Sequence, residues 1–352
     1  MTLPDAPPAS LRLRIDTAAL ADNWRTMDRL SGSATAGAAV KANGYGLGID
    51  FVMPALLGAG ARNFFVAHWS EVAGVLAYTA GETIAVLHGV ADEQEAAYAR
   101  ATGAVPVINS LPQARLWLQS GGGRCHLMVD SGINRLGVEP GNLGDPVLEK
   151  LEIDTLMSHL ASADEESAQN ARQLAVFREA ASRLPAKRLS LGNSAGIMLG
   201  EDYHFDLTRP GLALYGGVPR SELAGLIRQV AHVESAVLQL RDLSPGDAVG
   251  YNAVWHAERP TRAATLALGY ADGILRAWGK AGAVQHEGHG LPIIGKVSMD
   301  MIIVDCTGTN LAEGDFCNLS YDLPQASALT GLSQYELLTL LGNRFDRTTQ
   351  IA

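Results

Sequence analysis

A lysine that leads into a glycine-rich segment is the first feature of this sequence that could perform chemistry. Lys41 follows an apolar run and begins the segment 41–48, which reads Lys-Ala-Asn-Gly-Tyr-Gly-Leu-Gly. Partial desolvation lowers the pKa of a lysine amine and makes the amine a nucleophile toward an aldehyde, as a Schiff-base lysine requires. A lysine at the rim of a fold can instead extend into solvent along an apolar surface. This segment alone therefore permits a catalytic amine without requiring one.

The elements that must position Lys41 are short apolar runs separated by helix-like stretches. Eight such runs occupy residues 38–41, 64–68, 84–88, 105–109, 125–130, 153–159, 189–194 and part of 205–215. Unbroken hydrophobicity is typical of strands that are covered on both faces, and helices predicted at 111–120 and 165–182 would connect parallel strands. Eight units of this kind predict an α/β fold, a (β/α)8 TIM-type barrel.

The predicted strands end in polar residues. In a TIM barrel the active site lies at the C-terminal ends of the strands. The residues at those ends are Lys41, His68, His88, Asn109, Asp130, His159, Ser194 and Arg209. A structural role for so many polar groups at one rim is the weaker explanation, so we predict an active site there.

A second, mostly β domain follows the barrel. Strand-like runs at 232–242, 264–269, 291–296 and 301–306 are separated by glycine-containing turns. We expect a barrel domain at 1–230 and a mostly β domain at 231–352. An isolated strand at 11–15 is expected to join the β domain, before a helix that Asp16 or Thr17 caps. We interpret residues 285–290 as an exposed, glycine-punctuated loop.

The composition excludes several classes of partner. The 352 residues carry a net charge of −10, which repels nucleic acids and anionic membranes. No secretory leader and no apolar stretch of about 18 residues is evident, so we expect a cytoplasmic protein. The three cysteines are too widely spaced for a disulfide framework or a CxxC site, and the histidines lack paired metal-binding spacing. We therefore expect a small-molecule ligand and no metal.

Three segments give these residues a specific context. They are 40–48 around Lys41, 268–273 (Leu-Gly-Tyr-Ala-Asp-Gly) and 208–216 (Thr-Arg-Pro-Gly-Leu-Ala-Leu-Tyr-Gly). Together they resemble the alanine racemase family, and the resemblance extends over nearly the whole chain. It implies a barrel followed by a β domain, with pyridoxal 5'-phosphate as the cofactor. It also implies that Lys41 carries this cofactor and that Tyr45 hydrogen-bonds to its phosphate.

The resemblance gives Tyr270, in the Gly-Tyr-Ala-Asp-Gly motif, the role of a second base. An aromatic residue at such a turn is ordinarily a packing residue. Inversion of a stereocentre, however, requires one face to lose a proton while the opposite face gains one, so two opposed acid/base groups are the simplest arrangement. In the family, the equivalent of Lys41 abstracts the proton from D-alanine and that of Tyr270 abstracts it from L-alanine.

A tyrosine, with a reference pKa of about 10, is a poor base at neutral pH without assistance. The segment 157–164 (Met-Ser-His-Leu-Ala-Ser-Ala-Asp) is similar to the family's histidine motif. This implies that His159 hydrogen-bonds to Tyr270 and communicates with Arg209. A lone histidine at a strand end is more often a core group with satisfied hydrogen bonds, so the matched context supports the role.

Arg209 occupies the family position that faces the pyridine nitrogen. An arginine keeps its proton, so the ring nitrogen stays largely unprotonated and the ring becomes a weaker electron sink. This arrangement favours reprotonation at Cα over transamination. The alternative is a buried ion pair with Asp206. For the phosphate group, the resemblance implies contacts from Ser194 and from the backbone at Gly211 and Leu212, where barrel phosphate sites commonly lie.

Three further residues are implied to contact the substrate. Arg135 lies in a segment, 130–137, that resembles the family's DxGxxRLG motif and would bind the substrate carboxylate. In the β domain, the resemblance implies that the Met299 backbone N–H meets this carboxylate and that Tyr251 lines the substrate access path. Two positions depart from the family pattern. Met128 replaces a lysine that is carbamylated in many relatives, and Asn343 replaces a second gate tyrosine.

These features predict a racemase of alanine that supplies D-alanine for peptidoglycan or consumes it. The resemblance implies a homodimer in which the active sites are shared between subunits. A racemase of serine or of broad specificity stays open because of Met128 and Asn343. An amino-acid decarboxylase is disfavoured by Arg209. A non-catalytic pyridoxal-phosphate carrier is disfavoured by the β domain and by Tyr270.

Overall fold

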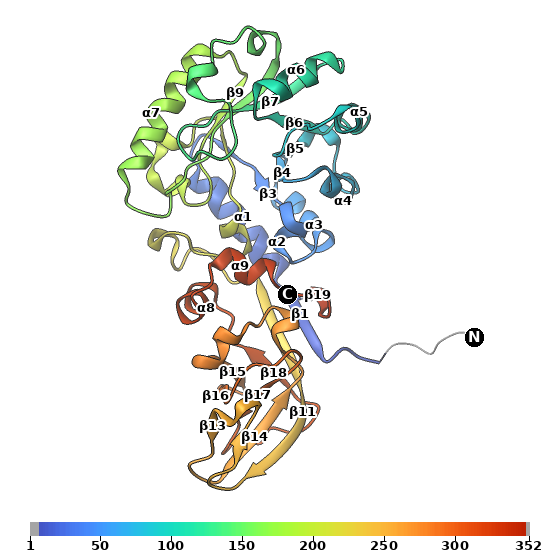
Figure 1. Cartoon of the computed structure of the whole chain (residues 1–352), viewed down its shortest axis with the longest axis vertical. Helices are drawn as coiled ribbons and strands as arrows, with labels where there is room; N and C mark the ends of the chain where they lie inside the picture. Colours follow the sequence, from blue (N-terminus) through green and yellow to red (C-terminus); the bar gives the residue numbers. More distant parts are fainter. Residues whose placement is uncertain (1–6, 350–352) are drawn as a thin grey trace, which may run out of the picture. The chain divides into compact units, whose positions relative to one another are not determined.

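The computed structural model describes residues 7–349, which form two compact units (Figure 1). The barrel unit consists of Ala18–Arg228. The β unit combines the N-terminal segment up to Thr17 with the chain from Gln229 onward. The predicted fold class, an α/β barrel followed by a mostly β domain, is confirmed.

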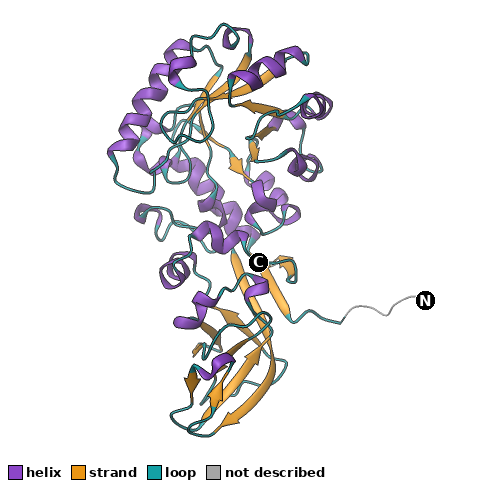
Figure 2. Cartoon of the chain, viewed as in Figure 1, coloured by secondary structure: helices purple, strands orange, loops and turns teal. Residues whose placement is uncertain are grey.

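The barrel unit is built on a curled, parallel sheet with helices on its outside (Figure 2). Its seven strands follow the chain order: β3 (Ala38–Ala39), β4 (Phe64–Val66), β5 (Ile84–Val86), β6 (Val105–Ile108), β7 (Arg124–Met128), β8 (Glu152–Met157) and β9 (Arg188–Ser190). Strands β3 to β6 are apolar and buried along their whole length, as expected for strands that are covered on both faces, whereas β7, β8 and β9 also contain charged residues. The α-helices that accompany them are α1 (Thr17–Leu30), α2 (Lys41–Tyr45), α3 (Ile49–Ala59), α4 (Val72–Leu76), α5 (Glu93–Thr102), α6 (Leu111–Gln119) and α7 (Ala168–Arg183).

The eighth predicted strand does not belong to this sheet. β10 (Leu207–Thr208) pairs in parallel with β2 (Thr35–Ala36) in a separate two-stranded sheet. The first predicted strand, 38–41, is shorter in the structure because β3 ends at Ala39, and β2 precedes it on the other side of Gly37, where a Cβ atom would lie 2.7 Å from the Phe65 ring. Backbone hydrogen bonds still link the last strands to the first, since Arg209 donates to Gly192 O (2.8 Å) and Ala39 donates to Pro210 O (3.0 Å). The barrel therefore retains eight strand positions, as predicted, although its strands belong to two sheets.

Local capping sets the start of the long helix α7. The Oγ of Ser167 accepts a hydrogen bond from the backbone N–H of Gln169 at 3.2 Å, so the helix begins at Ala168. The predicted start at residue 165 was therefore three residues early. The buried face of α7, which includes Leu174 and Phe177, packs into the barrel core.

The β unit is organised around the long strand β11 (Ala231–Leu243). Strand β1 (Leu11–Ile15) pairs with it antiparallel and also runs parallel to β19 (Asp346–Thr349). The other strands are β12 (Ala248–Val249), β13 (Trp255–His256), β14 (Thr261–Leu266), β15 (Ala283–His286), β16 (His289–Pro292), β17 (Ile302–Asp305) and β18 (Phe316–Leu319). Two helices, α8 (Leu323–Thr330) and α9 (Gln334–Thr339), precede the last strand.

Residues 285–290 form a β-hairpin, so the prediction of a loop was wrong. β15 and β16 are antiparallel, and His286 lies opposite His289. The two turn residues, Glu287 and Gly288, have φ values of 47° and 81°. Two left-handed residues match the type I' turn, whose twist suits a hairpin, and the glycine adopts this conformation without strain.

Short 3-10 helices complete the chain. Those used below are η1 (Trp69–Glu71), η6 (Glu201–Tyr203), η7 (Leu212–Tyr215), η9 (Tyr251–Ala253), η10 (Tyr270–Asp272) and η11 (Arg276–Lys280). Within residues 7–349, no helix combines the length and the apolar character needed to cross a membrane. The same residues contain no cluster of three or more His, Cys, Asp or Glu side chains arranged to bind a metal ion.

Candidate active site

Lys41 lies in a left-handed turn of the backbone. β3 ends at Ala39, and Lys41 is the first residue of α2, so it does not end a strand as predicted. The next three residues have φ values of 55° (Ala42), 54° (Asn43) and 64° (Gly44). For a residue with a side chain this conformation costs about 1–2 kcal/mol. The surrounding structure must therefore stabilise the turn that presents Lys41.

The electrostatic environment of Lys41 favours the neutral amine. Burial lowers the pKa of Lys41, and the positive charge of Arg135 lowers it further, while the negative charge of Glu71 opposes both effects. A lysine with a lowered pKa holds more of the nucleophilic, unprotonated form near neutral pH. The barrel rim thus supplies the amine that the sequence predicted.

Glu71 stabilises this turn, and the sequence analysis did not identify it. Its Oε1 accepts a hydrogen bond from the N–H of Ala42 at 2.5 Å. Its Oε2 accepts from the N–H groups of Ala67 (2.7 Å) and His68 (3.0 Å), directly after β4. One carboxylate therefore joins the Lys41 turn to the end of the neighbouring strand. The available signal was a glutamate three residues after the strand-end residue His68, the spacing of a capping box.

Replacing Glu71 with glutamine is expected to lower kcat roughly tenfold. The amide nitrogen of glutamine cannot accept a hydrogen bond, so one side of the carboxylate's contacts is lost and the turn that presents Lys41 would shift. The measurement is steady-state racemisation, together with the melting temperature. Glu95→Gln is a matched control, since Glu95 Oε2 accepts a similar hydrogen bond from Ala91 N (2.7 Å) one strand further along. Equal kcat values for Glu71→Gln and the unmodified protein would contradict the assigned role.

Arg209 is buried with its positive charge unpaired. Its Nη1 donates to Ser190 Oγ and its Nη2 donates to Ser158 O, both at 2.5 Å. The alternative ion pair with Asp206 is not formed, because Asp206 Oδ2 accepts from Leu189 N at 2.7 Å. Burial lowers the pKa of Arg209 to about 10, so the guanidinium remains protonated at neutral pH. Within residues 7–349 only neutral acceptors hold this cation, so its charge remains available to a bound group.

His159 is held neutral beside these cations. Burial lowers its pKa to about 3, and the positive charges of Arg209, Arg135 and Lys41 act in the same direction. The structure therefore brings Lys41, Arg135, His159 and Arg209, which come from separate segments of the barrel unit, into electrostatic range of one another. A neutral imidazole can accept and donate hydrogen bonds, so it can serve as a relay.

The stability of the protein is expected to fall on acidification. Burial also lowers the pKa of His126, inside β7. Because the unfolded histidines bind protons below a pH of about 6.5 and the folded ones do not, the free energy of unfolding should decrease as the pH falls from about 6.5 toward 3. Each histidine contributes up to about 1.4 kcal/mol per pH unit in this range. Urea unfolding at pH 7 and pH 5 measures the difference.

His159→Gln is the variant that identifies the source of this pH dependence. It removes one of the histidines whose pKa the fold lowers, and it should reduce the slope of unfolding free energy against pH. An unchanged slope would show that His159 does not titrate between the folded and unfolded states. His126→Gln provides the parallel measurement on the second histidine.

Tyr45, Ser194 and Gly211 are packed together at the end of the barrel. Ser194 Oγ accepts hydrogen bonds from Gly211 N (2.9 Å) and Ala213 N (3.2 Å), around the start of η7. The Tyr45 ring stacks on that of Tyr215 with a centroid distance of 4.4 Å. A Cβ atom at Gly211 would collide with the Tyr45 hydroxyl, so only glycine fits there. Tyr215 was not predicted as a site residue, although it lies in the same segment as Arg209.

The loop that follows β7 holds Arg135. Asp130 Oδ1 organises this loop by accepting hydrogen bonds from the backbone N–H groups of Gly132, Ile133 and Asn134. Arg135 lines a cavity of about 460 Å³ beside it. Met128, where many relatives have a carbamylated lysine, is buried. Within residues 7–349 the Arg135 guanidinium forms no hydrogen bond or ion pair, so its contribution here is its charge beside Lys41.

The predicted site residues of the β unit line one cavity. Tyr251, Tyr270 and Met299 enclose it together with Arg276 and Lys296, and its volume is about 390 Å³. The Arg276 guanidinium lies over the Tyr270 ring, 5.6 Å from its centroid. Tyr251 is 68% exposed and Met299 is 53% exposed on the single chain.

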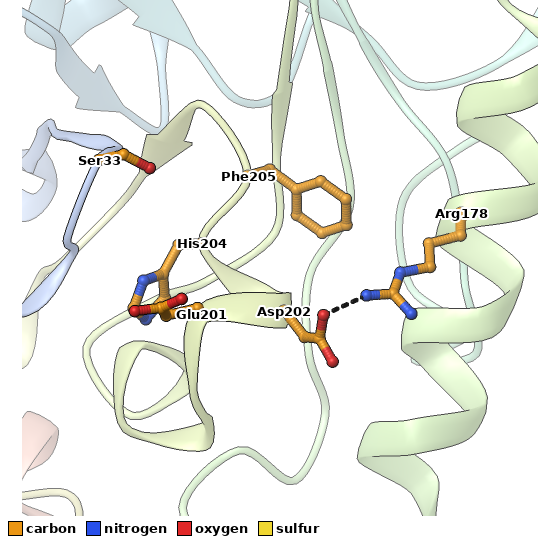
Figure 3. Close-up of a pocket in the computed structure, with 6 residues that line it drawn as sticks. All are labelled: Ser33, Arg178, Glu201, Asp202, His204 and Phe205. Carbon is orange, nitrogen blue, oxygen red and sulfur yellow. Dashed lines mark hydrogen bonds and ion pairs between the residues drawn. The ribbon is translucent and has the colours of Figure 1, made fainter.

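Another cavity, of about 440 Å³, is not a candidate active site (Figure 3). It lies where Ser33 and Phe205 precede β2 and β10, at the N-terminal ends of the barrel strands. Arg178 and Asp202 point toward each other across it and form an ion pair at 2.6 Å. Barrel active sites lie at the opposite end of the strands, and Arg178 and Asp202 here already pair with each other.

Comparisons with known proteins cover both units of the chain. The family of the alanine racemase N-terminal domain matches residues 15–219, and that of the C-terminal domain matches residues 230–349. An alanine racemase of Methylobacterium nodulans is 42% identical, over 96% of this chain and 95% of its own length. A catabolic alanine racemase of Agrobacterium fabrum is 40% identical, over 97% of this chain and 92% of its own length. The crystal structure of alanine racemase from Bartonella henselae with covalently bound pyridoxal phosphate has a TM-score of 0.90 and 36% identity, covering 97% of this chain and 100% of that one.

Proposed function

The chain belongs to the alanine racemase family, and we propose that it interconverts L- and D-alanine with Lys41 and Tyr270 as opposed acid/base groups. It is an alanine racemase that uses pyridoxal 5'-phosphate. The observation that carries the proposed mechanism is the convergence of Lys41, Arg135, His159 and Arg209 at one end of the barrel.

The residues present fit this cofactor. Lys41 offers an amine with a lowered pKa, and Arg209 offers a buried guanidinium without a carboxylate partner. Gly211 allows the hydroxyl groups of Tyr45 and Ser194 to lie close to its backbone, where a Cβ atom would collide with the Tyr45 hydroxyl. When bound, pyridoxal phosphate withdraws electrons from the amino acid and makes its α-hydrogen acidic. Lys41 would hold the aldehyde carbon, Arg209 would face the ring nitrogen, and Tyr45, Ser194 and the backbone at Gly211 and Leu212 would hold the phosphate.

The two bases act from opposite faces of the substrate. Lys41 removes or returns the α-proton on the D face, and the Tyr270 hydroxyl does so on the L face. Arg135 and the Met299 backbone N–H bind the substrate carboxylate, which fixes Cα between the bases. His159, neutral at physiological pH, supports proton transfer at Tyr270. Arg209 keeps its proton and so favours rapid return of a proton to Cα.

We infer that Tyr270 and Met299 act in the active site of a partner subunit. Tyr251 and Met299 are large side chains that are more than half exposed on the single chain, beside the cavity that contains Tyr270. Exposed apolar groups that cluster around a cavity are typical of an interaction surface. The protein is then a homodimer with shared active sites, and an isolated monomer is inactive.

The proposed setting is the cytoplasm, with D-alanine either supplied for peptidoglycan or consumed. Agrobacterium fabrum has both a biosynthetic and a catabolic alanine racemase among the relatives of this chain, at 38% and 40% identity. Broader specificity is a second candidate. Asn343 is exposed and is smaller than the gate tyrosine of many relatives, which leaves more room for a substrate larger than alanine, such as serine.

The function is tested by incubating the purified protein with L-alanine and pyridoxal phosphate and resolving the enantiomers over time. Equal amounts of L- and D-alanine at equilibrium support the proposal. Turnover of serine without turnover of alanine would reassign the substrate, and bound cofactor without any racemisation would overturn the mechanism. Sedimentation velocity on the same preparation tests the dimer, and activity from a monomeric species would contradict shared active sites.

A further inference from the structure

Two loops of the β unit carry the residues proposed to face the substrate. Residues 269–273 present Tyr270, and residues 298–300 present Met299. Tyr270 N donates to Ser298 O and Ala271 N donates to Met299 O, each at 3.0 Å. A Cβ atom at Gly269 would collide with the Met299 carbonyl. The loops therefore contact each other through their backbones. Their relative position determines where the Tyr270 hydroxyl lies with respect to the Met299 N–H that is proposed to bind the substrate carboxylate.

One arginine from the C-terminal segment bridges both loops. Arg344 forms a bidentate pair with Asp272, from Nε to Oδ1 at 2.7 Å and from Nη2 to Oδ2 at 2.8 Å. Its Nη1 donates to Asp300 Oδ1 at 2.7 Å. The planar guanidinium engages three carboxylate oxygens at once, which a lysine ammonium cannot reproduce in the same geometry.

The Asp272 end of this bridge is buried. The Asp272 carboxylate is fully buried, and its Oδ2 also accepts a hydrogen bond from Gly269 N at 2.9 Å. The hydrogen bonds to Asp272 and then to Asp300 raise the pKa of Arg344, so the arginine stays charged at all physiological pH values. Asp272 thus secures both ends of the turn that contains Tyr270.

The segment before Arg344 packs directly on the Tyr270 loop. A Cβ atom at Gly273 would collide with Leu340 O, and one at Gly342 would lie 2.9 Å from Ala271 O. Gly342 N also donates to Asp272 O at 3.4 Å. The loop is enclosed between residues 298–300 on one side and residues 340–344 on the other, so a shift of the C-terminal segment would move Tyr270.

We propose that Arg344 is a positioning residue that fixes the Tyr270 loop against the Met299 loop through Asp272 and Asp300. The proposal rests on the proposed role of Tyr270 as a base. If so, proton transfer at Tyr270 depends on Arg344, although the Arg344 guanidinium contacts neither the Tyr270 hydroxyl nor the Met299 backbone N–H. An ion pair that served only the fold would affect the melting temperature and leave the balance between the two proton transfers unchanged.

The experiment compares Arg344→Lys, Arg344→Gln and Asp300→Asn holoenzymes. For Arg344→Gln, kcat is expected to fall about 10- to 100-fold, since displacement of a reacting group by about 1 Å has effects of that size. Arg344→Lys should recover part of this loss. The deuterium isotope effect on kcat with Cα-deuterated L-alanine should rise, because transfer at Tyr270 becomes slower, while the effect with deuterated D-alanine changes less. Asp300→Asn should act mainly on KM, through the Met299 loop.

Arg259→Gln provides the matched control. Arg259 pairs with Asp305 at 2.9 Å in the same unit and touches neither loop. Like the Arg344 variants, Arg259→Gln removes an ion pair of the β unit. Its kcat and isotope effects should nevertheless equal those of the unmodified enzyme. If Arg344→Gln does not fold, Arg344→Lys, which keeps a positive charge beside the buried Asp272, carries the same isotope measurement.

Three results separate the possible failures. Unchanged kcat and isotope effects in Arg344→Gln, with only a lower melting temperature, would overturn the positioning role. An equal rise of both isotope effects would also overturn it, because the disturbance would then not pass through Tyr270. Full activity in Tyr270→Phe would instead overturn the proposed base, and this variant is measured alongside the others.

Discussion

Replacement of Lys41 by alanine is expected to abolish racemisation, with a loss of at least about 1000-fold in kcat. The variant removes the amine that would hold the cofactor and also one of the two proton-transfer groups, each of which is a major catalytic contribution. Burial and Arg135 lower the pKa of this amine, and no other lysine shares its position in the left-handed turn at the barrel rim. Chiral analysis of alanine and the visible absorbance of the protein after gel filtration measure the two losses.

Lys187→Ala is the control for Lys41→Ala. Lys187 lies in the same unit, has a 64% exposed side chain, and pairs with Glu152 at 3.8 Å. Its removal should leave both activity and cofactor absorbance unchanged. If Lys41→Ala retained tightly attached cofactor and measurable racemisation, another amine would have to perform this role.

Tyr270→Phe is expected to lower racemisation by about 100- to 10 000-fold, the usual contribution of a general acid/base. The change removes one oxygen and keeps the ring under Arg276, so the cavity of the β unit should persist. Lys41 would still exchange the α-proton of D-alanine. Incubation of D-alanine in D2O should therefore give deuterium incorporation without inversion, which nuclear magnetic resonance and chiral chromatography detect together.

The comparison with Tyr335→Phe shows whether this loss is specific. Tyr335 is 46% exposed in the same unit, in α9, and is not among the residues lining the Tyr270 cavity. Its substitution should preserve racemisation. Inversion at the normal rate in Tyr270→Phe would exclude Tyr270 as the second base, and the absence of exchange from D-alanine would indicate that Lys41 had also been displaced.

Local sequence patterns were sufficient to predict the fold class and the family. Buried parallel strands are apolar along their whole length, so a run such as Val105–Ile108 is visible in the sequence. Motif residues such as Lys41 and Tyr270 are recognisable because their neighbours in the chain are part of the motif. Their catalytic roles stay predictions that the variants above test.

The hairpin at 285–290 and the bounds of the first strand show where local patterns were ambiguous. His-Glu-Gly-His has the composition of an exposed loop, and only the partner strand makes it a two-residue turn. Similarly, no local pattern indicated β2 before Gly37, where the chain lies close to Phe65, 28 positions later.

The sequence by itself determined the fold class, the family and the motifs around Lys41, His159, Arg209 and Tyr270, because periodicity and motif spacing are properties of neighbouring residues. Only the tertiary structure decided what supports these groups. Glu71 acts on a backbone N–H 29 positions away, and Arg344 acts on a carboxylate 72 positions away. A glutamate or an arginine looks the same in a sequence whether it lies in solvent or binds a distant loop. Its partner exists only after folding has brought the two segments together.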